Sequence, residues 1–321
     1  MTGRDQRFLV LIPVIQMDGR WIRSMRGEKS PVDPYLPYGW FNDQERTLEG
    51  DVKEVAAVLL TNRECPYSCL MCDLWKHTTS ETVPVGAIPA QLEYALEKLS
   101  PATHLKLFNS GSFFDPRAIP VEDYPRIAAL SSGKESVLVE SHTAFIGKEC
   151  LEFSRMLNSQ LQVAIGLETV HPEILPRLNK GMNLEDFKKS VDFLRSNGIL
   201  TRAFILLRPP FLSEAEGVEW ACRSIDFAFG CGVDVCSVIP VRSGNGALDS
   251  LALNGYFQEP TIHSLERVIE YGTGLQKGLI FADLWDLERF SRCDNCFASR
   301  KERLNQINLT QESVKFVECS C

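Results

Sequence analysis

The 321-residue sequence has no apolar run of the roughly eighteen or more residues that a membrane-spanning helix requires. Residues 1–14 lack the charged, long apolar and small-residue pattern of a secretory signal. Positive charge is not in excess either, because 34 Lys and Arg stand against 42 Asp and Glu, a net charge of −8. No overall positive field attracts nucleic acid or membrane, so any nucleic-acid contact requires a local patch. We expect a soluble, cytoplasmic protein with no membrane partner.

The main cysteine motif also lacks a fourth metal ligand close by in the sequence. The chain has 11 cysteines, an odd number, and Cys65, Cys69 and Cys72 stand within eight residues. Thiolates are soft ligands that suit iron–sulfur clusters, zinc or Cu(I), and a cubane cluster normally takes four of them, one for each iron. Because the local set stops at three, a cluster held by these cysteines would leave one iron open to a small molecule.

Three other interpretations of this cysteine motif remain. A structural zinc site closes with four ligands, usually in two pairs, which the local spacing does not supply. Disulfides are disfavoured in a reducing cytoplasm and do not fit an odd number of cysteines. Buried core thiols seldom cluster so tightly.

Short apolar runs alternate with amphipathic segments from residue 52 onward. Strands are predicted at residues 54–61, 104–108, 136–140, 162–167, 201–207 and 233–238. Helices are predicted at residues 89–99, 122–130, 147–157, 184–196 and 213–229. Strands that alternate with helices indicate a parallel sheet. The predicted fold is therefore α/β, a partial (β/α)6 TIM-like barrel at residues 51–255, with an N-terminal extension at 1–50 that wraps it and a Cys-rich extension at 256–321.

Reactive residues in such barrels lie at the carboxyl ends of the strands. Candidates at these positions are Asn109, Ser110, Gly111, Glu140, His142, Glu168 and Arg208. Asn109 and Ser110 offer side-chain oxygens and Gly111 allows close backbone approach, so this loop suits an ammonium group. The alternative is a simple glycine turn.

The charged candidates suit other groups. Glu140 or Glu168 can accept two hydroxyls or hold an amine, and Arg208 can clamp a carboxylate bidentately, although either glutamate can instead pair with Arg208. His142 suits proton transfer or a purely structural hydrogen bond. Catalytic roles are predicted for Glu168 and His142.

A second group of cysteines lies near residue 321. Its members are Cys293, Cys296, Cys319 and Cys321. Four thiols in two close pairs suffice for a closed zinc site or an auxiliary iron–sulfur cluster, and free thiols are the remaining alternative. The densest basic patch lies around them and is either a phosphate-binding surface or a solvated one. It comprises Arg289, Arg292, Arg300, Lys301 and Arg303.

The spacing of Cys65, Cys69 and Cys72 resembles that of the radical S-adenosylmethionine (SAM) superfamily. Residues 61–246 are similar to the subgroup that includes the Elongator catalytic subunit and the methylthiotransferases. The segments TNRECPYSCLMCDLW, FNSGSFFDPRAIP, GLET, NKGM and RPPFLSE most resemble the archaeosine-forming radical SAM enzymes.

The resemblance implies a [4Fe–4S] cluster whose open iron chelates SAM, and an electron donor that reduces it. It also implies a lyase that cleaves a C–N bond of a lysine-adduct deazaguanine in tRNA and leaves a formamidine. The loop of Asn109, Ser110 and Gly111 would contact the methionine amino group, Glu140 or Glu168 the ribose, and Arg208 the methionine carboxylate. Two alternative functions are a radical SAM enzyme with a small-molecule substrate and a zinc-stabilised adaptor that binds nucleic acid or protein.

Overall fold

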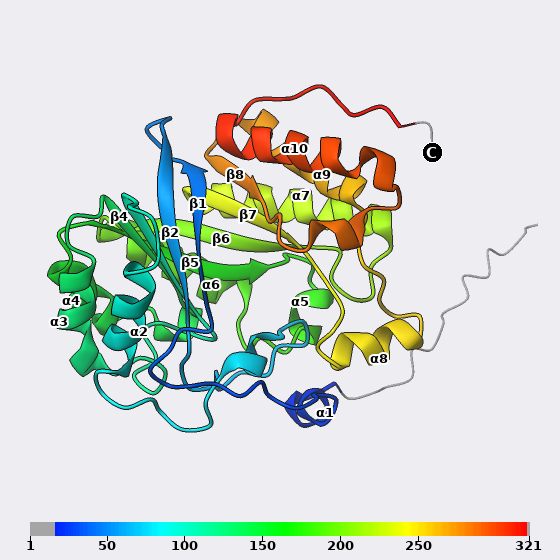
Figure 1. The fold of residues 1–321 in the computed structure, drawn as a ribbon. Helices are drawn as coiled ribbons and strands as arrows, with labels where there is room; N and C mark the ends of the chain where they lie inside the picture. Colours follow the sequence, from blue (N-terminus) through cyan, green and yellow to red (C-terminus); the bar gives the residue numbers. More distant parts are fainter. Residues whose placement is uncertain (1–16, 320–321) are drawn as a thin grey trace, which may run out of the picture.

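A single curled sheet organises the chain in the computed structural model, which describes residues 17–319 (Figure 1). The strands follow one another in sequence order across this eight-stranded sheet. They are β1 (Gly39–Arg46), β2 (Val52–Leu60), β3 (His104–Asn109), β4 (Ser136–Glu140), β5 (Gln160–Glu168), β6 (Leu200–Leu207), β7 (Val235–Pro240) and β8 (Leu279–Ala282). β1 is antiparallel to β2, whereas the strands from β2 to β8 pair in parallel.

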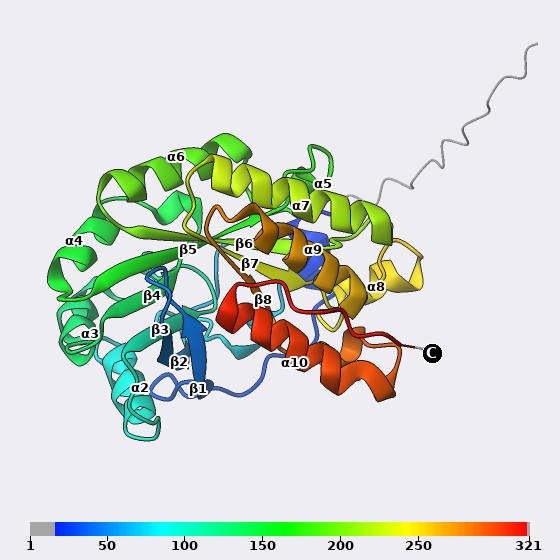
Figure 2. The same ribbon diagram turned by 90° about the horizontal axis from the view of Figure 1, so that it is seen from above.

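Helices lie around the curled sheet, and several of them cover its outer face (Figure 2). The helices of residues 17–319 are α1 (Gly19–Ser24), α2 (Ala87–Leu96), α3 (Tyr124–Leu130), α4 (Lys148–Met156), α5 (Ile174–Arg177), α6 (Leu184–Ser196), α7 (Glu214–Gly230), α8 (Ala247–Leu253), α9 (Ile262–Leu275) and α10 (Asp294–Thr310). Short 3₁₀ helices are η1 (Leu74–His77), η2 (Val121–Asp123), η3 (Thr143–Phe145) and η4 (Leu287–Phe290). The central parallel strands are buried on both faces, which explains their continuous apolar runs.

Local sequence fixes where two of the helices begin. Asn183 and Asp186 form a reciprocal capping box at the start of α6, and Ser213 and Glu216 form another at the start of α7. Each box satisfies two backbone N–H groups that a helix start leaves without partners. These caps end the loops that follow β5 and β6, so they also help to set the backbone at the carboxyl end of the barrel.

The barrel is open between its two edge strands, and α10 covers the gap. Arg46 of β1 donates to the carbonyl of Leu309, with 3.2 Å between Nη1 and O. On the other edge, the side-chain amides of Asn308 and Gln311 bond the backbone of Ala282 and Ile280 in β8. An exposed edge presents unpaired N–H and C=O groups, so these contacts protect β8 from pairing with another chain.

The predicted partial TIM-like barrel is confirmed. The six predicted strands correspond to β2 through β7, and the five predicted helices correspond to α2, α3, α4, α6 and α7. β1 and β8 were not predicted, and neither were the helices after β7. The Cys-rich end is present as well, whereas the division of the chain at residues 50 and 255 stays a prediction.

Most of the predicted basic patch is engaged with acidic side chains. Arg303 is only 3% exposed, and it pairs with Glu266 and Glu270 of α9. Arg300 also pairs with Glu266, whose side chain is fully buried. Because a buried carboxylate needs such partners, these arginines fasten α10 to α9. Arg292 and Lys301 are exposed, and a phosphate-binding role of the patch stays a prediction.

Candidate active site

The loop with Cys65, Cys69 and Cys72 follows the carboxyl end of β2 and is held from two sides. Leu70 N donates to Leu178 O at 2.9 Å, and Asn179 Nδ2 donates to Ser68 O at 2.7 Å. From the loop after β7, Asn245 Nδ2 donates to the carbonyls of Leu70 at 2.8 Å and of Cys72 at 3.3 Å. The loop conformation is therefore fixed by segments far away in the sequence.

All three of these cysteines line one cavity of about 1120 Å³ inside the barrel. Of the cysteines in residues 17–319, no other lines it. Their sulfur atoms do not form a group within 4.8 Å of one another, as those of Cys293, Cys296 and Cys319 do. Thiolates that share one zinc lie close together because each Zn–S bond is only about 2.3 Å. Three thiols at one cavity, with no fourth described cysteine lining it, fit a cluster in which each thiolate binds a different iron.

Burial raises the pKa of these thiols, to about 11 for Cys65 and Cys69 and to about 12 for Cys72. The free thiols therefore stay protonated near pH 7. Only thiolates ligate metal, so loading of this site must release protons.

The loop of Asn109, Ser110 and Gly111 lies against the cysteines. Ser110 and Gly111 line the cavity, and a Cβ added at Gly111 would lie 3.2 Å from the Cβ of Cys65. This close approach explains the need for glycine. Asn109 is fully buried behind the cavity wall, and its side-chain amide has no hydrogen-bond partner among the described residues.

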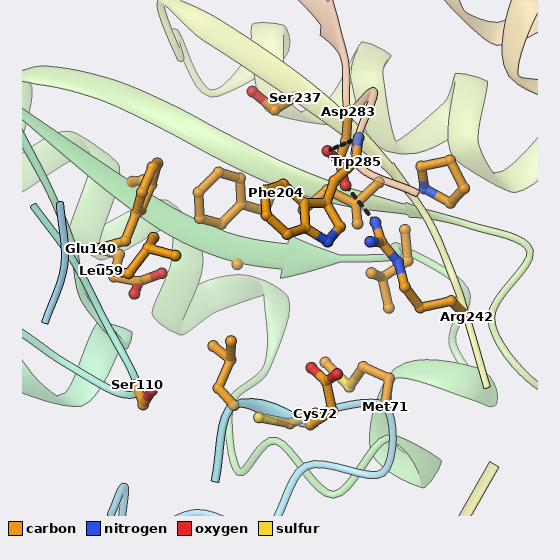
Figure 3. Close-up of a pocket in the computed structure, with 18 of the residues that line it drawn as sticks. Leu59, Met71, Cys72, Ser110, Glu140, Phe204, Ser237, Arg242, Asp283 and Trp285 are labelled. Atoms are coloured by element: carbon orange, nitrogen blue, oxygen red, sulfur yellow. Dashed lines mark hydrogen bonds and ion pairs between the residues drawn. The ribbon is translucent and has the colours of Figure 1, made fainter. Parts of the chain in front are cut away.

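Glu140 projects into the cavity from the end of β4 (Figure 3). Its Oε1 accepts from the backbone N of Asn109 at 2.7 Å. Burial raises the pKa of Glu140 to about 8, so the carboxyl group is largely neutral near pH 7. A neutral carboxyl group both donates and accepts, which suits a ligand hydroxyl better than an ammonium group.

Glu168 and Lys180 form a buried ion pair in the cavity wall, with 2.6 Å between Oε1 and Nζ. Burial opposes the charge of Lys180, but Glu168 and Cys69 outweigh it, so the pKa of Lys180 is raised. A Cβ at Gly166 would lie 2.1 Å from Oε1 of Glu168 and 2.5 Å from Nζ of Lys180. Gly166 therefore makes the space for this pair.

His142 lines the cavity with both ring nitrogens engaged. Nε2 donates to the carbonyl of Lys180 at 2.9 Å, and Nδ1 accepts from Ala144 N at 3.1 Å. The ring stacks on Tyr67 with centroids 4.0 Å apart, and burial lowers the pKa of His142 to about 4. The neutral imidazole thus connects the cysteine loop to the loop of Lys180, and proton transfer would require one of these bonds to break.

Arg208 directly follows β6, its backbone is in the left-handed region with φ of 55°, and it is absent from the cavity lining. Its guanidinium donates to Glu214 at 2.5 Å, to Glu259 O at 2.9 Å and to Gln258 at 3.0 Å. The structure therefore brings Ser110, Gly111, Glu140, His142 and Glu168 together with the cysteines but directs Arg208 toward α7.

Many cavity residues were not identified from the sequence, and four of them bear on the function. Lys180 belongs to the quoted NKGM segment without an assigned role, and Arg242 lies just beyond β7. Asp283 and Trp285 follow β8, which was not predicted. Lys180 and Arg242 both follow predicted strands, so the rule that reactive residues lie at strand ends could have identified them.

The second cysteine group forms a compact cluster. The sulfur atoms of Cys293 and Cys319 lie 3.6 Å apart, and Arg300 Nε donates to the sulfur of Cys296 at 3.3 Å. Cys321 lies outside the described residues. The arrangement can hold a metal ion whose identity the geometry alone does not fix.

Comparison with known proteins adds two kinds of relatives. No family model matches the chain. An uncharacterized protein of Methanocaldococcus jannaschii is 27% identical over 323 residues, which cover 93% of this chain and 87% of that protein. Archaeosine synthase subunit beta of Methanosarcina acetivorans is 26% identical over 273 residues, or 79% and 77% of the two chains.

Two solved structures share the fold. Elp3 of Methanocaldococcus infernus matches with a TM-score of 0.50 and 15% identity, over 68% of this chain and 59% of that one. SuiB of Streptococcus suis, bound to SAM, matches with a TM-score of 0.52 and 15% identity, over 69% and 48%. The chain thus spans about half the length of these two proteins.

The fold, the cysteine loop and these relatives together support a radical SAM enzyme, so the predicted resemblance is confirmed. Within that class, the chain is related to archaeosine synthase subunit beta. None of the helices in residues 17–319 has both the length and the apolar character needed to cross a bilayer.

Proposed function

We propose that Cys65, Cys69 and Cys72 hold a [4Fe–4S] cluster and that the protein cleaves SAM reductively to abstract a hydrogen atom from a substrate. The observation that carries this proposal is the trio of thiols at one cavity, with no further described cysteine lining it. When bound, the cluster supplies the electron that cleaves SAM. A reductant must therefore act as the electron donor.

The polar residues of the cavity suit the groups of SAM. Ser110 and Gly111 lie beside Cys65, where they would contact the methionine amino group, and the neutral carboxyl of Glu140 suits the ribose hydroxyls. Lys180 would hold the methionine carboxylate in place of Arg208, because its ammonium group faces the cavity. Glu168 orients that ammonium group and remains the candidate for contact with the reacting atoms.

The proposed substrate is tRNA that carries a lysine-adduct deazaguanine, whose C–N bond the enzyme cleaves in the cytoplasm. Relatives named archaeosine synthase subunit beta support this assignment, and their name also suggests a second subunit as a partner. A small-molecule substrate is the second candidate. The net charge of −8 and the pairing of Arg300 and Arg303 with α9 favour it.

An assay with this tRNA separates the two candidates. The reconstituted enzyme, with SAM and a reductant, is expected to convert the lysine adduct to a formamidine, detected by mass spectrometry of the digested tRNA. Transcript with unmodified guanine at the same position is the matched control. Release of 5′-deoxyadenosine without formamidine would contradict the tRNA assignment and favour a small-molecule substrate.

The C-terminal cysteines are expected to hold a metal that stabilises the end of the chain. Replacing Cys293 and Cys296 together with serine should remove one metal equivalent and lower the melting temperature by several degrees, because structural metal sites contribute directly to folding. Elemental analysis and thermal unfolding check both effects. If the double variant keeps the full metal content, there is no metal site at these residues.

The same elemental analysis tests the adaptor alternative. A zinc-stabilised binding protein would purify without colour and without iron under anaerobic conditions. The proposed enzyme is instead expected to be brown and to contain iron bound by Cys65, Cys69 and Cys72.

A further inference from the structure

The cavity has a second wall that the proposed cofactor does not use. Arg242, Asp283, Trp285 and Asp286 form it at the ends of β7 and β8. Figure 3 shows the first three across an open space from Cys72. Ligand pockets typically have about 300–1,000 Å³, and this cavity of about 1120 Å³ extends from the cysteine loop to this wall.

This wall is held in place relative to the cysteine loop. Asp283 N donates to Val238 O at 2.9 Å, which continues the pairing of β7 with β8. Next to Arg242, the loop of residues 243–246 contacts the cysteine loop through Asn245, and Lys76 Nζ donates to Gly244 O at 2.7 Å. The distance between the two walls is therefore set by direct hydrogen bonds.

The wall carries both signs of charge. Nη2 of Arg242 lies 2.6 Å from Oδ2 of Asp283, and Nη1 lies 3.9 Å from Oδ2 of Asp286. A guanidinium has five N–H donors, and within residues 17–319 the only hydrogen bond that Arg242 donates is the one to Asp283. One guanidinium therefore stands against two carboxylates. Arg289, whose Nη2 donates to Oγ of Ser243 at 3.0 Å, and Lys301 also line the cavity, so groups of both signs are available to a ligand.

Trp285 adds an apolar surface next to these charges. Its side chain is 57% exposed, and its ring lies 6.2 Å from that of Phe41 on β1. Its backbone N donates to Oδ1 of Asp283 at 3.0 Å, which holds the Trp285 backbone beside the ion pair. Exposed aromatic rings next to polar groups are typical of recognition sites.

We propose that this wall is a substrate subsite for a zwitterionic α-amino-acid group. The carboxylate of the ligand binds Arg242, its ammonium group binds Asp283 and Asp286, and its aliphatic stem lies along Trp285. Arg242 and Asp283 of the internal ion pair then each exchange their partner for an oppositely charged group of the ligand. The inference rests on the proposed function for the position of SAM on the opposite wall.

Calorimetric titration of the reconstituted enzyme, with SAM and without a reductant, tests the subsite. L-Lysine is the probe. Cadaverine lacks its carboxylate and 6-aminohexanoate lacks its α-ammonium group, and both are expected to bind at least tenfold more weakly. Arg242→Gln and Asp283→Asn should each weaken lysine binding at least tenfold. Arg155→Gln, a change at an exposed arginine of α4, should leave it unchanged.

Arg242→Lys keeps the positive charge but loses the planar pair of N–H donors that a guanidinium presents to a carboxylate. Weaker lysine binding by this variant therefore supports the subsite even if Arg242→Gln does not fold. The proposal is overturned if the wild type does not bind lysine, if cadaverine binds equally well, or if lysine affinity is unchanged in all three variants. It is also overturned if tRNA without the lysine adduct, and not lysine, binds in an Arg242-dependent way. Wild-type enzyme that releases 5′-deoxyadenosine but fails to bind lysine refutes this inference alone, whereas lysine binding without SAM cleavage refutes the proposed function.

Discussion

Alanine at any one of Cys65, Cys69 or Cys72 is expected to abolish both the iron content of the main site and the release of 5′-deoxyadenosine. These are the described cysteines that line the cavity, so no neighbouring thiol there can replace a lost ligand. Outer-shell residues at metal sites already contribute about 10- to 100-fold to affinity or activity. Loss of a ligand should therefore cost more than about 100-fold, measured by chromatography of the SAM products after anaerobic reconstitution.

Cys222→Ala is the matched control, because Cys222 lies on α7 and is absent from the cavity lining. It should keep wild-type iron content and turnover. Undiminished turnover in any of the three loop variants would refute the assignment of the cluster to these cysteines.

Lys180→Met is expected to have the second large effect, on both folding stability and SAM binding. The side chains of Lys180 and Glu168 are only 12% and 7% exposed. Removing one partner of a buried ion pair typically costs about 3–5 kcal/mol, because the other charge stays buried without compensation. Urea unfolding of the apoprotein measures this loss, and calorimetry of the reconstituted protein measures SAM affinity.

The double variant Lys180→Met/Glu168→Gln separates these two effects. It removes both charges, so it should recover much of the stability that Lys180→Met loses. SAM binding should stay weak in the double variant if Lys180 contacts the methionine carboxylate. If the free energy of unfolding of Lys180→Met lies within about 1 kcal/mol of the wild-type value, Lys180 and Glu168 do not form a buried ion pair in which each charge depends on the other.

The central barrel could be predicted because its strands are buried on both faces. The continuous apolar run of β2 and the cysteine loop after it are both visible in the sequence. β1 was missed because it is an edge strand with the polar sequence Gly-Trp-Phe-Asn-Asp-Gln-Glu-Arg, and β8 because it has only four residues. Without β8, no sequence pattern places Asp283 or Trp285 beside the cavity.

The strand-end rule located candidate residues correctly along the chain but not the direction of their side chains. Arg208 follows β6 as the rule requires, yet its left-handed backbone turns the guanidinium toward Glu214. The partners of Arg300 and Arg303 lie on α9, more than 30 residues earlier. Such long-range pairing depends on the tertiary fold, so sequence spacing alone suggested an exposed patch.

We propose above all that one iron of the cluster has no protein ligand and binds SAM. Electron–nuclear double resonance of the reduced, reconstituted enzyme is the most direct test, with SAM labelled at the amino nitrogen and the carboxylate oxygens. Hyperfine couplings from both labels are expected, since the unoccupied iron position would bind both groups. Absence of both couplings in protein that contains a full complement of cluster iron would contradict a cluster held by Cys65, Cys69 and Cys72 alone.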